Sequence, residues 1–322
     1  MGLALGLILL VICLAASVAF GSADIDLATV YDALTAFDQS TDHLIIRTVR
    51  LPRALIGIIV GAALGIAGAI MQGLTRNPLA SPDILGVSAG AALAVVAAIF
   101  YLGPISPTAT TWFAFIGAGA AAVIVYSLGS LGRSGLNPIK LTIAGAALNA
   151  LLSSLTTGIL IFNQRTLEEV RFWLAGSLSG RDSSTLLQVL PYISIGLIFA
   201  LVMSRQLTTL TLGEDVAQGL GQPTAWVKLA AAVMVVLLAG SSVALAGPIG
   251  FVGLVVPHLV RFGVGVDYRW VLPYSGIGGA ILLSIADVSA RLLIQHQELP
   301  VGVMTTLIGA PFFVYIAQWK IK

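Results

Sequence analysis

Long apolar segments, separated by short clusters of charged residues, glycine and proline, dominate the pattern along this chain. A helix that crosses the hydrocarbon core of a bilayer needs about 20 mostly apolar residues. The apolar run from Leu229 to Val260 is divided at Gly247-Pro248, because this pair breaks a helix and supplies a turn. The pattern predicts ten spans, near residues 3–20, 54–74, 84–103, 112–130, 140–162, 185–204, 226–246, 249–266, 271–290 and 302–318. We therefore expect an all-α polytopic membrane protein.

The composition agrees with this interpretation. The chain has 322 residues, of which 58% are hydrophobic and only 9% are charged, whereas about 25% of the residues in an ordinary soluble domain are charged. A single cysteine, Cys13, excludes an internal disulfide framework. The net charge of +2 gives no reason to expect nucleic-acid binding.

An even number of spans places both termini on the same side of the membrane. Cytoplasmic loops carry an excess of lysine and arginine. If the termini are cytoplasmic, nine cations lie inside, namely Arg76, Arg133, Lys140, Arg205, Lys228, Arg261, Arg269, Lys320 and Lys322. Seven lie outside, namely Arg47, Arg50, Arg53, Arg165, Arg171, Arg181 and Arg291. All four lysines are then inside and every outer cation is an arginine, so we expect cytoplasmic termini.

The outer arginines next to the second span allow two interpretations. Arg50 and Arg53 could extend to lipid headgroups, which is common for cations at span boundaries. Alternatively, they could present their fork-shaped donors to carboxylates of a docking protein. At the outer end of the ninth span, Asp287 and Arg291 have the i,i+4 spacing of an ion pair, and mutual neutralisation is the interpretation we favour there.

Chemical motifs are scarce within the spans. Ion-coupled carriers generally need carboxylates or broken-helix ion sites near the midplane, and the first eight spans show none, so any transport is expected to draw its energy from elsewhere. No phosphate-binding G-x-x-x-x-G-K-[ST] motif occurs. Three scattered histidines and one cysteine predict no metal site. "GVSAG" matches the G-x-S-x-G elbow at Ser88, but an intramembrane serine hydrolase would need a histidine partner that the sequence does not offer.

Small residues and turns mark packing surfaces and inner loops. Glycines recur along the second span at 57, 61, 65 and 68, and "SGIGGA" from Ser275 is a similar stripe, so close helix packing is expected. Ser81-Pro82-Asp83 predicts the start of the third helix after a short inner loop. In "LGEDVAQGLG", Gly213 precedes an acidic helix start and Gly221 follows its end, which suits a docking element for a soluble partner.

A short internal echo favours a duplicated architecture. Ala67-Gly68 precedes Pro78 by the same interval by which Ala246-Gly247 precedes Pro257. With five spans in each half, the halves would have inverted topology.

Seven segments, in order after residue 45, resemble the permease subunits of bacterial ABC importers for iron–siderophore complexes and cobalamin, the FecCD type. They are "RLPRALIGIIVGAALGIAGAIMQGLTRNPLASPDILGVSAGAAL", "LTIAGAALNALLSS", "WLAGSLSGRD", "LGEDVAQGLG", "AGPIGFVGLVVPHLVRF", "ADVSARLL" and "ELPVGVMTTLIGAPFFV". Within this family, "NPLASPDILGV" and "GSLSGRD" are most similar to ferric citrate and siderophore permeases.

The resemblance implies a type II ABC importer permease with about ten helices and inverted repeat halves. It implies one domain over residues 1–322. Its parts would be a first helix (1–20), a first half (54–162), an outer loop and sixth helix (163–205), cytoplasmic coupling helices (206–224) and a second half (226–318). The chain would not be an enzyme and would bind no cofactor or metal, because ATP is used by partner subunits.

Partners and cargo follow from the same resemblance. The chain would pair with itself or a related permease in the bacterial inner membrane, above two ATPase subunits. A periplasmic or lipid-anchored substrate-binding protein would dock outside. A ferric siderophore, possibly ferric citrate, is the first choice of cargo, followed by heme and cobalamin. A secondary carrier that works without an ATPase is the alternative class.

The family's functional residues map onto three groups in this chain. Outer arginines that pair with glutamates of the binding protein correspond to Arg50, Arg53 and Arg291. The segment that couples to the ATPase corresponds to Leu212, Gly213, Glu214 and Asp215. The cytoplasmic gate corresponds to Asn77, Leu79, Asn137 and Pro138, although the last loop lacks the polar pair of the cobalamin permease.

Overall fold

The computed structural model describes residues 2–21, 23, 25–131, 136–181, 183–293 and 298–319. Arg133, Lys320 and Lys322 of the predicted inner set lie outside the described residues. The helices are α1 (Gly2–Ala19), α2 (Leu27–Thr35), α3 (Thr41–Ile45), η1 (Ile46–Arg50), α4 (Leu51–Thr75), η2 (Pro82–Leu85), α5 (Val87–Leu102), α6 (Pro107–Gly129), α7 (Pro138–Phe162), α8 (Gln164–Leu174), α9 (Ser183–Val202), α10 (Ser204–Thr211), α11 (Glu214–Gly219), α12 (Thr224–Val235), η3 (Val236–Gly240), α13 (Ser241–Ala246), α14 (Val252–Val264), α15 (Tyr268–Leu292) and α16 (Val301–Trp319). Within the described ranges no strand occurs.

Among the described residues, an apolar helix lies at each of the ten predicted spans. Seven are long and apolar enough to cross a membrane: α1, the continuous helix from α3 to α4, α6, α7, α9, the helix from α12 to α13, and α15. Three shorter apolar helices, α5, α14 and the described part of α16, supply the remainder. The second span begins earlier than predicted, because α3 and the π-helical turn η1 run directly into α4.

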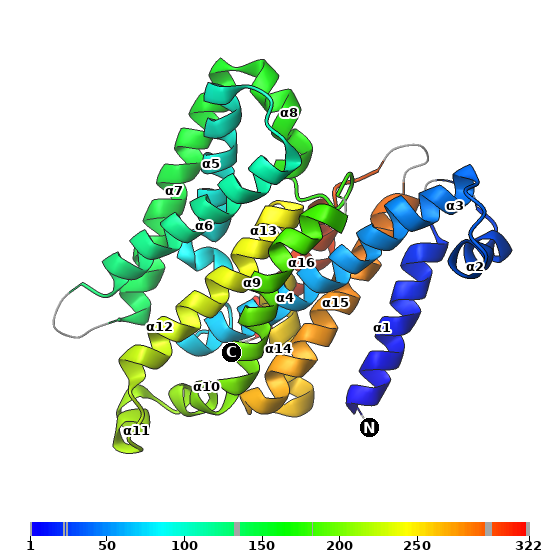
Figure 1. The fold of residues 1–322 in the computed structure, drawn as a ribbon. Helices are drawn as coiled ribbons and strands as arrows, with labels where there is room; N and C mark the ends of the chain where they lie inside the picture. Colours follow the sequence, from blue (N-terminus) through cyan, green and yellow to red (C-terminus); the bar gives the residue numbers. More distant parts are fainter. Residues whose placement is uncertain are drawn as a thin grey trace.

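The bundle has two distinct ends (Figure 1). The N-terminus lies at the same end as α10 and α11, which we call the α11 end. Helices α2, α3 and α8 lie at the opposite end, which we call the α8 end. This arrangement agrees with the prediction that the first residues and the segment 206–224 share one side.

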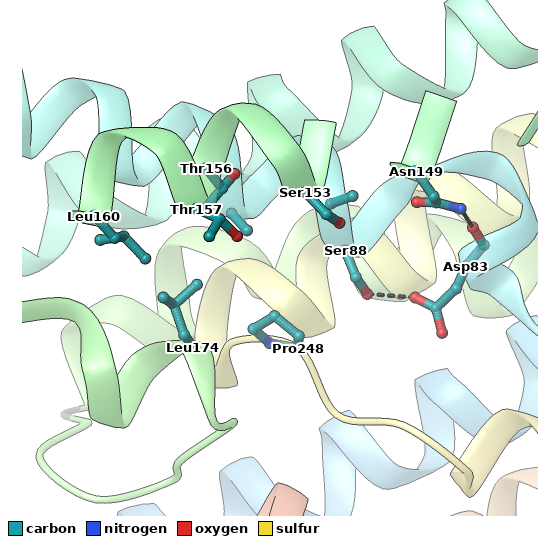
Figure 2. A pocket seen from close by; sticks show the side chains of 11 residues that line it. Asp83, Ser88, Asn149, Ser153, Thr156, Thr157, Leu160, Leu174 and Pro248 are labelled. Atoms are coloured by element: carbon teal, nitrogen blue, oxygen red, sulfur yellow. Dashed lines mark hydrogen bonds between the residues drawn. The ribbon is translucent and has the colours of Figure 1, made fainter. Parts of the chain in front are cut away.

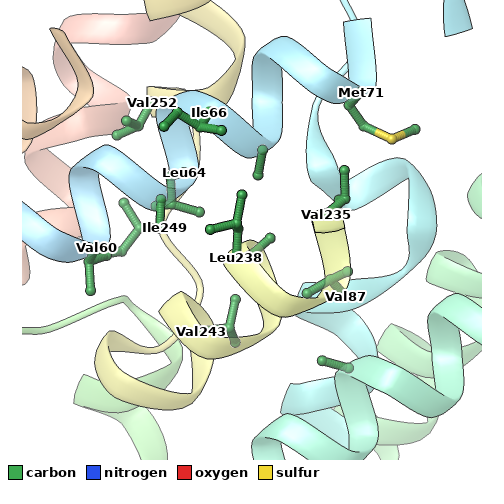
Figure 3. Packing of buried hydrophobic residues seen from close by; sticks show 14 of the residues in the cluster. Val60, Leu64, Ile66, Met71, Val87, Val235, Leu238, Val243, Ile249 and Val252 are labelled. Atoms are coloured by element: carbon green, nitrogen blue, oxygen red, sulfur yellow. The ribbon is translucent and has the colours of Figure 1, made fainter. Parts of the chain in front are cut away.

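Helix α4 forms the centre of the bundle, and its glycine stripe brings other backbones close. A Cβ added at Gly61 would collide with the carbonyl of Gly279, and one added at Gly65 would collide with that of Ser275. Both partners lie on α15, in the "SGIGGA" segment, so the predicted packing is confirmed. Figure 3 shows the apolar core around α4, where labelled α4 residues lie among side chains from α5, η3, α13 and α14.

Two backbone breaks lie within the bundle. After α4 the chain re-enters the bundle, and Pro82 comes to lie close to Gly253. A Cβ placed at Gly253 would touch the Pro82 ring and the backbones of Leu64 and Gly68. The second break covers residues 247–251, where Gly247 and Phe251 have positive φ. Irregular backbone at membrane depth is tolerated where it is buried in protein or lines a cavity. The predicted inner loop before the third span is therefore a re-entrant segment.

The internal echo does not mark equivalent positions in the two halves. Pro78 lies in a turn of the re-entrant segment, whereas Pro257 lies inside α14. The inverted relation of the two halves stays a prediction.

The predicted outer loop after residue 162 begins with a helix. The Asn163 side chain accepts a hydrogen bond from the Thr166 amide at 3.0 Å, which caps α8. Thr166, Val170 and Trp173 form the buried face of α8, at spacings of four and three residues. Helix α8 was not predicted, because this segment is polar in composition and contains no long apolar run.

Candidate functional site

A cavity of about 430 Å³ lies between α5, α7, the end of α8 and the second backbone break. Figure 2 shows its wall, where Ser88 from α5 and Asn149, Ser153 and Thr157 from α7 point toward the same space. Leu174 and Pro248 complete the part of the wall near the α8 end. The polar groups of α7 recur with helical spacing, so one face of this helix borders the cavity.

Asp83 of η2 belongs to this wall and lies beside the middle of α7. Its backbone carbonyl accepts a hydrogen bond from Nδ2 of Asn149 at 2.8 Å, and its carboxylate Oδ1 accepts one from the Ser88 hydroxyl. The carbonyl of the next residue, Ile84, packs against Gly145. The sequence analysis placed Asp83 in the loop before the third span, whereas the fold brings its carboxylate into the wall of the cavity. This position could not be predicted from the sequence, because only the fold reveals that the loop containing Asp83 re-enters the bundle.

The serine hydrolase alternative finds no support in this geometry. Ser88 lies in the first turn of α5, and its hydroxyl donates directly to Asp83. None of the described residues that line the cavity is a histidine. A serine nucleophile needs an adjacent base to accept its proton, and the wall offers only a carboxylate that already accepts the serine hydrogen.

The predicted gate residues lie on two separate segments. The Asn77 side chain is exposed and accepts a hydrogen bond from the Leu79 amide at 3.0 Å. Asn137 caps α7 by accepting from the Ile139 amide at 2.9 Å, and Pro138 occupies the first helical position. Both asparagines thus stabilise local turns. Their role in a gate stays a prediction.

The predicted coupling segment forms a compact helical module at the α11 end. Gly213 occupies the N-cap position of α11 and has φ +117°. Residues other than glycine rarely adopt this backbone conformation. Glu214 and Asp215 follow in the first turn, where carboxylates suit the helix dipole. Leu212, Val216 and Leu220 remain exposed. These apolar residues recur every four positions, which makes them a candidate contact surface.

Helix α10, which precedes the module, is attached to the start of α15. The Asp267 carboxylate caps α15 and accepts from the Arg269 amide at 3.0 Å. Hydrogen bonds from Arg269 lower the pKa of Asp267 to about 2, so this carboxylate stays charged at neutral pH. The Tyr268 amide donates to the Thr208 hydroxyl of α10 at 2.9 Å.

Lys228 is a residue that the sequence reasoning counted only as an inner cation. Its Nζ lies 2.7 Å from Oε2 of Glu214 and donates at 3.1 Å to the carbonyl of Leu136. Although it is charged, the Lys228 side chain is only 5% exposed. The position of Lys228 inside an apolar span, near Trp226, could have identified it as a buried cation that needs a partner.

The three predicted docking arginines lie together at the α8 end, and all three are buried. Arg53 contacts the Asp287 carboxylate at 2.9 Å and the Glu298 carboxylate at 2.7 Å. Arg291 contacts Asp287 at 3.0 Å, which confirms the predicted i,i+4 ion pair. Extension of Arg50 and Arg53 to lipid headgroups is not seen, because both side chains bind groups of this chain.

Arg50 and Arg291 also hold the end of α1. Arg50 donates to the carbonyls of Val18 and Ala19, at 3.1 and 2.6 Å. Arg291 donates to the carbonyls of Ser17 and Phe20, at 3.1 and 2.7 Å. The last carbonyls of a helix lack partners within the helix, so these two arginines stabilise the α8 end of α1.

Glu298 is the most exposed acidic group of this cluster, with 30% of its side chain accessible. Burial raises the pKa of Glu298, but the hydrogen bond and charge of Arg53 outweigh this effect and leave the pKa below its usual value. The carboxylate therefore stays ionised and paired with Arg53. A pairing of Arg50, Arg53 or Arg291 with another protein stays a prediction.

Comparison with known families gives a match along almost the whole chain. The FecCD transport family matches residues 9–319. The Probable siderophore transport system permease protein YfiZ of Bacillus subtilis is 52% identical over 310 residues, which cover 96% of this chain and 93% of that protein. The Fe(3+)-citrate import system permease protein YfmD of the same organism is 45% identical and covers 98% and 93%. The iron(3+)-hydroxamate import system permease protein FhuB, also from B. subtilis, is 44% identical and covers 96% and 81%.

A solved structure has the same architecture. A metal-chelate type ABC transporter in an inward-facing conformation superposes with a TM-score of 0.85 at 30% identity, covering 98% of each chain.

Proposed function

Because this chain belongs to the FecCD transport family and is an ABC-importer permease, we propose that it carries a ferric siderophore across the bacterial cytoplasmic membrane. The observation that carries the proposal is the match of the whole chain to permeases named for siderophore, ferric citrate and ferric hydroxamate transport. Heme and cobalamin are the second choices of cargo. A secondary carrier is not favoured, because the full-length likeness is to permeases of ABC systems.

In the proposed arrangement the α11 end faces the cytoplasm, with both termini on that side. Two ATPase subunits bind there and hydrolyse ATP, and this chain binds no cofactor of its own. The exposed apolar residues Leu212, Val216 and Leu220 support a protein contact at this end. Leu212 to Asp215 are the residues through which nucleotide-driven movement of the ATPases would reach the permease.

The cavity beside α7 is the proposed station of the cargo within this subunit. Its wall offers hydroxyl and amide groups from Ser88, Asn149 and Ser153 next to apolar side chains. Such weak, distributed contacts suit a ligand that must leave again, because tight binding would slow release. Asn77 and Leu79, with Asn137 and Pro138, would close the path toward the α11 end.

A substrate-binding protein is proposed to dock at the α8 end through the arginine cluster. Arg53 is the member best suited to a carboxylate of that protein, because its present partner Glu298 is partly exposed and could be displaced. Arg50 and Arg291 would belong to the same docking surface and would also hold the end of α1.

Reconstitution tests the transport function. The chain, its partner permease, the ATPases and the binding protein are assembled in proteoliposomes, and uptake of a radio-iron-labelled ferric tris-hydroxamate is measured. We expect uptake only with ATP inside the same compartment as the ATPases and with the binding protein on the opposite side. Uptake by the purified chain alone would contradict the proposal and favour a secondary carrier.

The docking role has its own test. Glu298→Gln removes the competing charge from Arg53, so we expect binding-protein affinity to rise about twofold to fivefold at low salt, as for a single partly exposed charge pair. Arg53→Gln should lower the affinity by a similar factor. Surface plasmon resonance on nanodiscs measures both, and Glu168→Gln, at an exposed position of α8, is the matched control. Equal affinities for all variants would refute docking at Arg53.

A further inference from the structure

Lys228 connects α11, in the predicted coupling segment, with the beginning of α7, the helix that borders the cavity. On one side its ammonium group pairs with Glu214 in the first turn of α11, at 2.7 Å. On the other side it donates to the carbonyl of Leu136, at 3.1 Å. Leu136 directly precedes Asn137, the cap of α7. One buried side chain therefore joins the coupling module to the beginning of the helix that borders the cavity.

Stability alone does not account for this arrangement. Lys228 lies in the second turn of α12, toward the N-terminal end of the helix, where the helix dipole offers a cation no stabilisation. Replacement of a buried ion pair by apolar residues is often neutral or stabilising. Moreover, α11 is held to α12 without Lys228, because Gln218 donates to the Thr224 hydroxyl at 3.2 Å. What Lys228 adds is the contact with Leu136.

The segment beyond Leu136 is firmly attached to α7. The Leu141 amide donates to the Asn137 carbonyl at 2.9 Å, and the Asn137 amide donates to the Gly129 carbonyl of α6 at 3.2 Å. From there α7 runs without interruption for 25 residues and carries Asn149 and Ser153 to the cavity wall. A displacement of Leu136 is thus transmitted along a single rigid element.

We propose that Lys228 is the positioning residue that passes movement of α11 on to α7, so that events at the α11 end alter the cavity wall. This inference rests on the proposed function, because the movement of α11 is driven by the ATPases. Lys228 touches neither cargo nor nucleotide. It acts through its simultaneous contacts with the Glu214 carboxylate and the Leu136 carbonyl.

Distance measurements in the assembled importer test the proposal. On a Cys13→Ser background, spin labels are placed at Gly219 of α11 or Ile139 of α7, each paired with a reference label at Trp270 of α15. Gly219 and Ile139 are exposed, and Trp270 is half exposed. Double electron–electron resonance then compares both distances without nucleotide and with a non-hydrolysable ATP analogue.

Four forms of the protein separate the contributions of the two contacts. In wild type and in Lys228→Arg, whose guanidinium can donate to both partners, we expect both distances to change with nucleotide. In Lys228→Met the α11 distance should still change, whereas the α7 distance should stay constant. The charge swap Lys228→Glu with Glu214→Lys restores the ion pair but removes the donor to Leu136, so the α7 change should again be lost. Thermal melting confirms that each variant remains folded.

Each outcome is decisive. An α7 distance that still changes in Lys228→Met or in the charge swap overturns this inference alone. An α11 distance that does not change even in wild type overturns the proposed coupling through α11, and this inference with it. Loss of the α7 change confined to the two variants without a donor to Leu136 supports the assignment.

Discussion

At the residue scale, the buried charges carry the least obvious information. Arg53 and Arg291 share one carboxylate, Asp287, whose side chain is 2% exposed. Breaking a buried ion pair by removal of one partner is far more costly than exchange of an exposed charge, because the remaining charge cannot return to water. The arginine cluster therefore depends on Asp287.

Asp287→Asn tests this dependence. We expect a loss of about 3–5 kcal/mol in the free energy of unfolding, because two buried guanidinium groups lose their shared counter-ion. Asp32→Asn, at an exposed position on α2, is the matched control and should change stability by less than about 0.5 kcal/mol. Thermal unfolding in detergent measures both, and similar melting temperatures would contradict a structural role for the cluster.

The sequence predicted the position of the arginines but not their surroundings. Spacing alone identified the Asp287–Arg291 pair, because residues four apart on a helix are neighbours. The contact between Arg53 and Asp287 joins positions 234 residues apart. No local pattern encodes such a contact, and the same holds for Asp83, whose depth follows from the path of the loop.

At the scale of elements, close helix packing at α4 is the feature most directly encoded. The glycine stripe was visible in the sequence because small residues at spacings of three and four share one face. Its partner on α15 could be identified as a similar stripe, but not matched to it before the fold was known. Helix α8 was not predicted as a helix, because it is amphipathic and has no apolar run long enough to cross a membrane.

Gly65→Ala tests the contact between α4 and α15. The added methyl group would meet the Ser275 carbonyl, so the two backbones must separate, at a cost of about 1–3 kcal/mol. Gly158→Ala on α7 is the control, because a Cβ there has no neighbour within 4 Å among the described residues. Thermal unfolding should show a lower melting temperature only for Gly65→Ala. A drop for Gly158→Ala of the same size would argue against specific packing.

Gly213→Ala examines the start of α11. A residue with a side chain is strained by roughly 1–3 kcal/mol at φ +117°, so α11 should tilt or fray. We expect reduced ATP-driven uptake in proteoliposomes, with the ATPase subunits still active. Gly219→Ala, in the last turn of α11 with open space around it, should transport normally. Normal transport by both variants would contradict the role of this segment in coupling.

At the scale of the whole molecule, the ten-span architecture followed from hydrophobic length alone, and the family from ordered motifs. The partner of the exposed face of α7 could not be predicted from the sequence. Ala146, Ala150 and Ser154 are exposed at intervals of four residues on α7. Small residues at this spacing allow close approach of a neighbouring helix. The face is therefore suited to a helix of another subunit, and a second permease chain is the partner that we propose.

Photo-crosslinking tests this pairing. A photoreactive residue at Ala150 should yield a permease–permease product in the assembled importer, whereas one at exposed Ile198 on α9 should not. The mass of the product distinguishes a pair of identical chains from a pair of related ones. Crosslinking at Ile198 with none at Ala150 would assign the interface to another face.

The arginine contacts at the end of α1 set an order of events during biogenesis. Arg291 reaches back over 274 residues to the carbonyl of Ser17. The ribosome must therefore complete the ninth span before the first helix receives its closing hydrogen bonds. Of the two arginines at this end of α1, only Arg50 precedes the later spans in the chain, so its hydrogen bonds to the carbonyls of Val18 and Ala19 can form before those of Arg291.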